Sequence, residues 1–464
     1  MLLRELTVPL APAEAFTRLF AAHEDGFLLE SAEGPERLAR YSILGLDPVG
    51  KVRLDRGRLQ ATGDLPAPGD DEAPLAYLRR LLRAHVTTDQ GYRYLGGLVG
   101  HFGYEFVESL ERVPARPRDG WPDFEFGLYL DGLVFDRLTR KVVYFSHGRD
   151  RSAEFAASLE RPAATRPPRF SAPRANVDAE RFEKMVERAK VDITEGEVFQ
   201  VVLSRRFDLD VDGDLLPYYE ALKRANPSPY MYHVQHGERR LVGASPEMLV
   251  RVDGGRVETF PIAGTRPLGG SEAETERLAA DLLADPKEAA EHAMLVDLAR
   301  NDVGRVAEYA TVRVAESRKV ERFSHVQHLV SKVEGRLRPG RDALDAFAAV
   351  YPAGTVSGAP KVRAMELIRE LEPDARGPYA GAVGYFSFNG NADAAICIRT
   401  LAARGRRASV QAGAGIVHDS VPRNERLETE HKARGLLSVA STFSDDENVR
   451  VSRGSRRGET EGFR

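Results

Sequence analysis

Two pairs of glutamates stand three residues apart in the sequence, Glu288 with Glu291 and Glu425 with Glu428. On a helix this spacing places both carboxylates of a pair on one face, where like charges repel by about 0.2–0.5 kcal/mol. Mg²⁺ prefers hard oxygen ligands and retains several waters, so one carboxylate from each pair could bind it together with a carboxylate of a substrate. Lys432 continues the Glu428 face one turn further on. The spacing by itself is more typical of two solvated helix faces.

Two glycine-rich segments could bring backbone N–H groups close to an anion, since glycine permits a close approach of the main chain. They are AGTVSGAPK at residues 353–361 and AGAG at residues 412–415. Neither is a P-loop or a dinucleotide-binding fingerprint, because the lysine of the first segment and the glycines of the second lack the required spacing. Without further context, both patterns favour glycines in turns and bulges.

The histidines, the serines and the single cysteine argue against three common kinds of site: a zinc site, an acyl-transfer triad and a site built on paired cysteines. His325 and His328 lie three residues apart, but no third ligand is spaced to complete a zinc site, so we expect one buried and one surface histidine. No G-x-S-x-G motif is present, which argues against an acyl-transfer triad. The single cysteine, Cys397, excludes an intrachain disulfide and a CxxC metal site. Because it stands in the apolar run AAICIRT, we expect it to be a small core residue.

The elements that must position these residues are those of a mixed α/β or α+β protein with many antiparallel strands. We expect a helix capped by Asp178, long helices within residues 274–306 that break at Asp285-Pro286, and a last helix over residues 423–440. Continuous strands are predicted over residues 241–252, 394–402 and 408–417, among others.

The chain divides into blocks by composition. An N-terminal block, residues 1–150, mixes strand-like segments with two helical stretches. A proline-rich crossover follows at residues 151–177, with neither helical nor strand period from about residue 159. Residues 178–443 form the second block. Residues 444–464 are polar and charged, so we expect a disordered tail.

The overall composition is that of a soluble globular protein of 464 residues, 42% apolar and 29% charged. The net charge of −4 provides no general basic field, so we expect neither nucleic acid nor a membrane surface as a partner. The first residues, MLLRE, place charge where a signal peptide needs its apolar core, and no apolar run of about 18 residues occurs. We therefore expect a cytoplasmic protein.

Several longer motifs resemble the chorismate-utilising enzyme family, and within it the large subunits of anthranilate synthases. They are PIAGTRPLG (261–269), EHAMLVDLARND (291–302), GTVSGAPK (354–361), YAGAVGY (379–385), AICIRT (395–400) and NERLETEHKA (424–433). The resemblance covers about residues 178–439. In the N-terminal block, FLLES (27–31) and RYSILG (40–45) are similar to the family's feedback-inhibitor segment. The implied fold has large antiparallel sheets packed together and flanked by helices.

The resemblance implies a lyase reaction in which ammonia adds to ring carbon 2 of chorismate, the hydroxyl leaves carbon 4, and pyruvate is eliminated to give anthranilate. This is the first committed step of tryptophan biosynthesis. A glutamine amidotransferase needs a cysteine nucleophile, and Cys397 does not stand in the glycine-rich elbow of such an enzyme. A separate amidotransferase small subunit is therefore implied, commonly in a heterotetramer of two large and two small chains.

The family's site residues are carried over to matching positions of this sequence. The resemblance implies a Mg²⁺ cofactor held by Glu291 and Glu428, with Glu288 and Glu425 acting through bound water. It implies Glu247 as general acid, His328 as the histidine of the pyruvate-elimination step, and Thr265 and Thr355 in the substrate pocket. The remaining implied contacts to chorismate come from Arg399, Tyr379, Gly413, Gly415, Lys432 and Gln200.

Two positions distinguish the relatives within the family. Aminodeoxychorismate synthases of the common type carry a nucleophilic lysine where this chain has Ala263, and isochorismate and salicylate synthases carry a lysine base where it has Gln200. Neither alanine nor a neutral amide can do that chemistry, so both substitutions favour ammonia as the incoming group. Two alternatives stay open: an aminodeoxychorismate synthase with an altered nucleophile position, and an idle paralogue that binds tryptophan or metal.

The inhibitor segment implies a tryptophan site separate from the substrate pocket. Glu30, Ser31 and Ser42 offer acceptors for an ammonium group. Pro229, Tyr230 and Met231 in the second block offer apolar surface and backbone for the indole. From the local pattern alone, FLLES is a core strand with a terminal turn.

Overall fold

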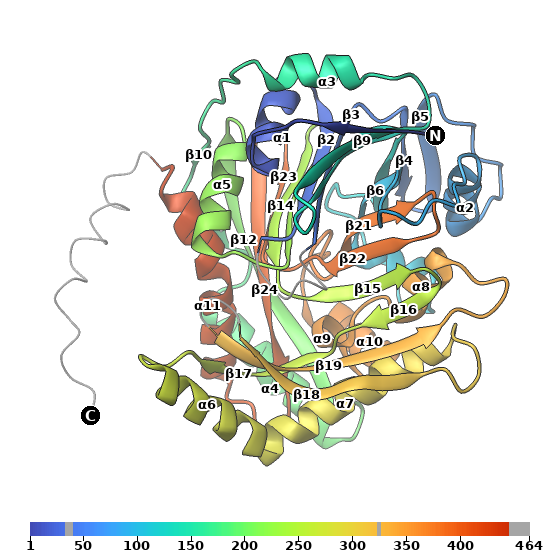
Figure 1. The fold of residues 1–464 in the computed structure, drawn as a ribbon. Coiled ribbons are helices and arrows are strands. Elements are labelled where there is room, and N and C mark those ends of the chain that lie inside the picture. The colour runs from blue at the N-terminus through green and yellow to red at the C-terminus, as the bar shows by residue number, and fades with distance from the viewer. Residues whose placement is uncertain (33–39, 323–325, 445–464) are drawn as a thin grey trace.

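The computed structural model describes residues 1–32, 40–322 and 326–444. In this part of the chain, two large antiparallel sheets of 13 and 11 strands pack together and helices cover their outer faces (Figure 1). The α+β class expected from the sequence is confirmed. His325 and the tail from residue 445 onward lie outside the described residues.

The larger sheet runs in the order β1 (Leu2–Leu6), β9 (Lys141–Ser146), β8 (Asp131–Asp136), β3 (Tyr41–Leu46), β2 (Asp25–Glu30), β13 (Tyr230–His236), β14 (Arg239–Ser245), β23 (Thr400–Arg404), β24 (Arg407–Ile416), β12 (Gln200–Asp212) and β10 (Arg169–Phe170). Two short strands, β11 (Arg174–Ala175) and β20 (Gly358–Ala359), also pair with β12. Since β10 and β11 lie in the proline-rich crossover, the expectation that residues 159–177 form no strand is wrong in this detail.

The smaller sheet runs in the order β17 (Ile262–Pro267), β19 (Val326–Arg336), β16 (Arg256–Thr259), β15 (Met248–Asp253), β22 (Ala392–Ile396), β21 (Ala382–Ser387), β6 (Gly97–Phe102), β7 (Phe124–Tyr129), β4 (Gly50–Asp55) and β5 (Arg58–Gly63). A further strand, β18 (Arg313–Arg322), pairs with β19. Both sequence blocks contribute to both sheets, because β2 pairs with β13 in one and β6 pairs with β21 in the other.

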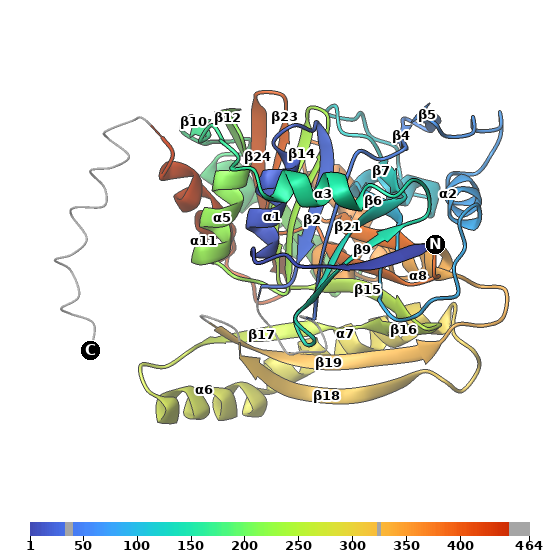
Figure 2. The ribbon, with the colours of Figure 1, turned by 45° about the horizontal axis from the view of Figure 1, so that its top comes forward.

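The helices are α1 (Pro12–Phe20), α2 (Pro74–Arg83), the 3₁₀ helix η1 (Tyr104–Ser109), α3 (Ser152–Leu159), α4 (Ala179–Thr194), α5 (Leu216–Ala225), α6 (Glu272–Ala284), α7 (Pro286–Gly304), α8 (Ala343–Val350), α9 (Gly354–Ser357), α10 (Lys361–Leu371) and α11 (Pro422–Ser441). One apolar core joins α1, α5 and α11 to the larger sheet, and another joins α2 and α8 to the smaller sheet. A third core lies between the sheets and includes Phe27, Tyr94 and Tyr232. In Figures 1 and 2, α6, α7 and strands β17 to β19 lie together at one end of the molecule.

Local signals in the sequence explain several helix boundaries. Asp178 caps α4 by accepting a hydrogen bond from the Arg181 backbone N–H (2.8 Å), as expected. The predicted break at Asp285-Pro286 is also confirmed, because Asp285 ends α6 and its carboxylate caps α7. Pro286 suits the first turn of α7, where its missing N–H would have no helical partner.

Two segments that the sequence predicts as continuous strands are each divided between the sheets. Residues 241–252 leave the larger sheet at the end of β14 and enter the smaller one at β15. Residues 394–402 change sheets in the opposite direction, from β22 to β23. The expectation of a single strand is wrong in both cases, because an apolar run that is buried on both sides of a sheet crossing has no periodicity to mark the crossing.

Among the described residues, no helix combines the length and the apolar character needed to cross a membrane.

Candidate active site

Glu247 and Arg399 lie at the two sheet crossings, and hydrogen bonds tie these crossings together. Ser245 Oγ donates to the carbonyl of Ile396 (2.7 Å), and the Ile396 N–H donates to the carbonyl of Glu247 (3.0 Å). The Ala244 N–H donates to the carbonyl of Arg399 (3.0 Å). Arg399 has a left-handed φ of 51°, which is unfavourable for arginine and is maintained here by tertiary contacts. The fold therefore places both candidate residues in the short connections between the sheets, Glu247 between β14 and β15 and Arg399 between β22 and β23.

Glu247 has the environment of a carboxylic acid that stays protonated near neutral pH. It borders a small cavity with apolar walls from α7, including Leu295 and Leu298, and it accepts a hydrogen bond from Thr355 Oγ1 (2.7 Å). Burial raises the pKa of Glu247 to about 7, although Thr355 and Lys432 favour the carboxylate. A group with this pKa can donate a proton to a leaving group at neutral pH.

His328 is held on β19 opposite Thr265 of β17. Its Nδ1 lies 2.8 Å from the carbonyl oxygen of Gly264 and 3.1 Å from Thr265 Oγ1. Because a carbonyl can only accept, Nδ1 carries the proton and Nε2 is the basic nitrogen. Burial, reinforced by the positive charges of Arg399 and Lys432, lowers the pKa of His328 and keeps the ring neutral. A neutral imidazole of this kind can remove a proton from a bound molecule.

Lys432 on α11 links the helix to the glycine-rich strand β24. Its Nζ donates to Glu428 Oε1 (2.6 Å) and to the carbonyl of Gly413 (2.9 Å). A methyl group on Gly413 would lie 2.5 Å from the Tyr379 hydroxyl, and one on Gly415 would lie 2.5 Å from Gln200 Nε2. The two glycines therefore permit side chains from other segments to approach β24 closely.

The four glutamates of the spaced pairs lie on α7 and α11, and Glu291 of α7 is near enough to Glu428 of α11 for their charges to interact. Burial raises the pKa of Glu291, and the negative charges of Glu288 and Glu428 add to this effect. Burial also raises the pKa of Glu425, with a further contribution from Glu428. Lys432 partly compensates the charge at Glu428, and Lys287 lies 3.8 Å from Glu291. Crowded carboxylates that disfavour their own ionised form are a suitable donor set for a hard divalent cation.

Across residues 1–32, 40–322 and 326–444, no group of three or more His, Cys, Asp or Glu side chains is arranged to hold a metal ion by itself. A Mg²⁺ ion does not need such a group, because it is commonly bound by one or two carboxylates, several waters and a substrate. The donors present on α7 and α11 are therefore compatible with Mg²⁺.

The six residues predicted to bind tryptophan gather where β2 pairs with β3 and β13. Four of them, Glu30, Ser31, Tyr230 and Met231, line a cavity that Val383, Tyr385 and Asp393 complete. The other two, Ser42 and Pro229, are buried but do not line this cavity.

Contacts of Glu30 reveal a detail that the sequence did not indicate. Its carboxylate accepts hydrogen bonds from the Tyr219 hydroxyl (2.7 Å) and from Lys223 Nζ (2.8 Å), both on α5. Ser42 lies opposite Glu30 in the sheet, and its buried hydroxyl has no hydrogen-bond partner among the described residues. Tyr385 and Asp393 are lining residues that sequence reasoning missed, although Tyr385 ends the quoted motif YAGAVGY.

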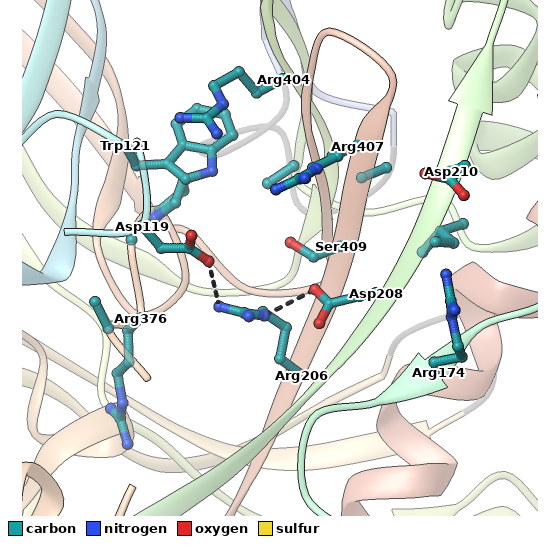
Figure 3. A pocket seen from close by; sticks show the side chains of 16 residues that line it. Asp119, Trp121, Arg174, Arg206, Asp208, Asp210, Arg376, Arg404, Arg407 and Ser409 are labelled. Carbon is teal, nitrogen blue, oxygen red and sulfur yellow. Dashed lines mark ion pairs between the residues drawn. The ribbon is translucent and has the colours of Figure 1, made fainter. Parts of the chain in front are cut away.

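A further cavity of about 450 Å³ is lined by a different set of residues (Figure 3). Trp121 and several arginines line it, and Arg206 forms ion pairs there with Asp119 (3.0 Å) and Asp208 (2.8 Å). None of its lining residues is among the predicted site residues.

Comparison with known proteins gives a consistent result. The family model described as chorismate binding enzyme matches residues 25–438. "Anthranilate synthase component 1" of Methanothermobacter marburgensis is 48% identical over 92% of this chain and 92% of its own length. The protein of the same name from Aquifex aeolicus is 44% identical, again over 92% of both chains.

Solved structures agree with these relatives. Anthranilate synthase component I from Streptococcus pneumoniae superimposes with a TM-score of 0.78 at 40% identity, over 87% of this chain and 93% of the other. The menaquinone-specific isochorismate synthase of Escherichia coli has a TM-score of 0.72 at 22% identity, over 94% of each chain, which shows a shared fold.

Proposed function

Because this chain belongs to the chorismate-binding enzyme family, we propose that it is the large subunit of an anthranilate synthase. In this proposal it converts chorismate and ammonia to anthranilate and pyruvate, the first step of tryptophan biosynthesis. The observation that carries the proposal is the joint presence of Ala263 and Gln200 in a chain 48% identical to a named anthranilate synthase component. At neither position does a lysine offer a nucleophile or a base, so free ammonia must be the nucleophile.

The geometry supports separate roles for two proton-transfer groups, Glu247 as the proton donor and His328 as the proton acceptor. Ammonia adds at ring carbon 2, both ring double bonds shift by one position, from C1=C2 to C1=C6 and from C5=C6 to C4=C5, and the hydroxyl leaves carbon 4 as water with the proton that Glu247 holds at neutral pH. The added nitrogen releases one proton and becomes a neutral amine. The Nε2 atom of His328 then removes the proton from ring carbon 2 as the bond between ring carbon 3 and the enolpyruvyl oxygen breaks. The ring becomes aromatic, and the enolate that leaves takes up a proton on its methylene carbon to become pyruvate. The Gly264 carbonyl supports this role because it fixes the proton on Nδ1.

Charged groups near β24 provide the complement to a dicarboxylate substrate. Arg399 and Tyr379 would hold the enolpyruvyl carboxylate, with the backbone at Gly415. Glu291 and Glu428 would hold Mg²⁺, with Glu288 and Glu425 behind its waters. When bound, the ion would neutralise the ring carboxylate and so bring chorismate close to the acidic helices.

Ammonia would come from glutamine through a separate amidotransferase subunit. Cys397 cannot serve as the amidotransferase nucleophile, because it is fully buried and burial raises its pKa to about 11. The partner and the heterotetramer are part of this proposal, as is feedback inhibition by tryptophan in the cavity of Ser31, Tyr230 and Tyr385.

The activity is tested by incubating the purified protein with chorismate, Mg²⁺ and ammonium at raised pH and following anthranilate fluorescence. Glutamine alone should give no product until an amidotransferase subunit is added. A product that retains the enolpyruvyl group would instead identify an aminodeoxychorismate synthase. Absence of any turnover with ammonium would favour the idle paralogue.

The inhibitor site is tested with Ser31→Phe, because a phenyl ring would fill the cavity. Tryptophan should inhibit the wild type. It should inhibit the matched control Ser31→Ala more weakly, because this variant keeps the cavity open but loses one acceptor, and it should not inhibit the phenylalanine variant. Equal inhibition of all three proteins would place the inhibitor elsewhere.

A further inference from the structure

A buried ion pair lies behind the proposed active site, between the end of α10 and the loop that leads to β21. Arg376 Nε donates to Glu372 Oε2 (2.9 Å), and Arg376 Nη2 donates to Glu372 Oε1 (2.6 Å). The two side chains are only 1% and 3% exposed. Although Arg376 borders the cavity of Figure 3, its guanidinium group is turned away from the Arg206–Asp119 ion pair.

The remaining contacts of Arg376 reach three different segments. Nη1 donates to the carbonyl of Val356 (2.7 Å) and Nη2 donates to the carbonyl of Val202 (2.7 Å). The guanidinium carbon also lies 4.7 Å from the ring centre of Tyr104 and 5.5 Å from that of Tyr379. Four of the five N–H groups of an arginine are thus used, in the fork geometry that lysine cannot reproduce.

Glu372 extends the same network to β12. Its Oε1 atom accepts hydrogen bonds from both the backbone N–H and the hydroxyl of Ser204, each at 2.8 Å. Ser204 lies opposite Gly413 and Val202 lies opposite Gly415 in the pairing of β12 with β24. The ion pair therefore fixes the part of β12 that supports both glycines.

Apart from the contact with Tyr104, each of these contacts is made with a proposed site residue, with its neighbour in the chain, or with the residue opposite it in a strand pairing. Val356 follows Thr355, whose hydroxyl donates to Glu247 (2.7 Å). Val202 and Ser204 support the glycines, and Tyr379 is itself a proposed substrate ligand. The ion pair therefore contacts three parts of the proposed site that are distant in sequence: the segment of Thr355, the β12–β24 pairing and Tyr379.

We propose that Glu372 and Arg376 are positioning residues for the reaction, which set the placement of Thr355, Tyr379 and the β12–β24 pairing relative to one another. The inference rests on the proposed function. A buried ion pair often contributes little net stability compared with apolar side chains of the same volume, whereas its fork geometry fixes the orientation of every group it contacts. Misplacement of reacting groups by about 1 Å can cost about 100-fold in rate.

The main test is Arg376→Lys, which keeps the charge but cannot make the fork. We expect kcat/KM for ammonium-dependent anthranilate formation to fall about 10- to 100-fold. The alkaline limb of the pH profile should also move upward, because a displaced Thr355 no longer stabilises the Glu247 carboxylate. A role confined to stability would change neither the rate nor the profile of the protein that remains folded.

The matched control is Arg239→Lys. Arg239 makes an equally short, mostly buried bidentate pair with Glu125, with both bonds at 2.7 Å and side chains 15% and 5% exposed. It lies at the opposite end of β14 from Glu247. This variant should lose thermal stability as Arg376→Lys does, but its kcat/KM should stay within about twofold of the wild type.

Arg376→Lys with kcat/KM within twofold of the wild type and an unchanged pH profile would overturn the proposal. If that variant does not fold, Ser204→Ala decides, because it removes one of the hydrogen bonds to Glu372 and leaves the ion pair intact. It also removes the hydrogen bond that Ser204 Oγ accepts from Gln411, so Gln411→Ala, which leaves the Glu372 contact in place, is its control. A decrease in kcat/KM of about 3- to 10-fold is expected for Ser204→Ala, and unchanged kinetics would again overturn the proposal. Failure of the proposed function is distinguishable, since the wild type itself would then make no anthranilate.

Discussion

Glu247→Gln should stabilise the protein in alkaline solution while it disables the enzyme. The ordinary pKa of this carboxyl is 4.5, and burial raises it to about 7 in the folded chain. Between these values the folded state binds a proton that the unfolded state has released, so the free energy of unfolding falls as the pH rises. The loss begins near pH 4.5 and is complete above pH 7. A shift of this size corresponds to about 3 kcal/mol.

The assay compares chemical denaturation of the wild type and Glu247→Gln at pH 5 and at pH 8. Glutamine has nearly the same shape and no charge, so it avoids the cost of burying a carboxylate. We expect the free energy of unfolding of Glu247→Gln, minus that of the wild type, to increase by about 2–3 kcal/mol from pH 5 to pH 8. Ammonium-dependent activity should fall by about 10²–10⁴ because the general acid is lost.

Glu125→Gln is the matched control with the opposite sign. Burial alone would raise the pKa of Glu125, but the hydrogen bonds from Arg239 outweigh it and lower the pKa. Its stabilising contribution is present above the unfolded pKa and is lost as the pH falls through the folded value. Glu125→Gln should therefore destabilise the protein at pH 8. The measured quantity is the difference in free energy of unfolding between Glu247→Gln and the wild type. If this difference is the same at pH 5 and pH 8, or favours the variant less at pH 8, then Glu247 is not a buried acid that holds its proton.

Three further substitutions test other parts of the site. Thr355→Val removes the hydrogen bond to the Glu247 carboxylate, so the alkaline limb of kcat/KM should move up by about one pH unit, whereas Thr355→Ser should behave as the wild type; a downward shift would contradict the contact. Glu428→Gln removes one charge from the α7–α11 carboxylates and should weaken Mg²⁺ binding by about tenfold or more, measured by calorimetry; unchanged affinity would remove Glu428 from the metal site. His328→Ala should accumulate an aminated, non-aromatic intermediate visible by chromatography, and normal anthranilate output from this variant would refute its assigned role.

Motifs in the sequence identified the residues of the proposed site, but not the way in which the fold brings them together. The boundary at Asp285-Pro286 could be predicted because proline suits the first turn of a helix and Asp caps it. The crossing at Arg399 could not, because residues 394–402 contain neither proline nor glycine, and a left-handed arginine is stabilised only by distant contacts. Arg376 was missed for a related reason. Its partners Val202 and Val356 are remote in sequence and contribute backbone carbonyls, which every residue type has.

The interleaving of the two sequence blocks has a consequence for synthesis on the ribosome. Strand β6 must wait for β21, roughly 290 residues further along the chain, before Gly97 can pair with Ser387. At about 5–20 residues per second, this delay is about 15–60 s. During this interval β6 lacks a neighbouring strand, and β2 also lacks one until β13, about 200 residues beyond it, has been made. Edges of this kind pair readily with other chains. The protein is therefore most prone to aggregate, and most dependent on chaperones, while only its N-terminal half has been synthesised. By the same reasoning, separately expressed halves cut within residues 151–177 should be insoluble alone and should become soluble when produced together.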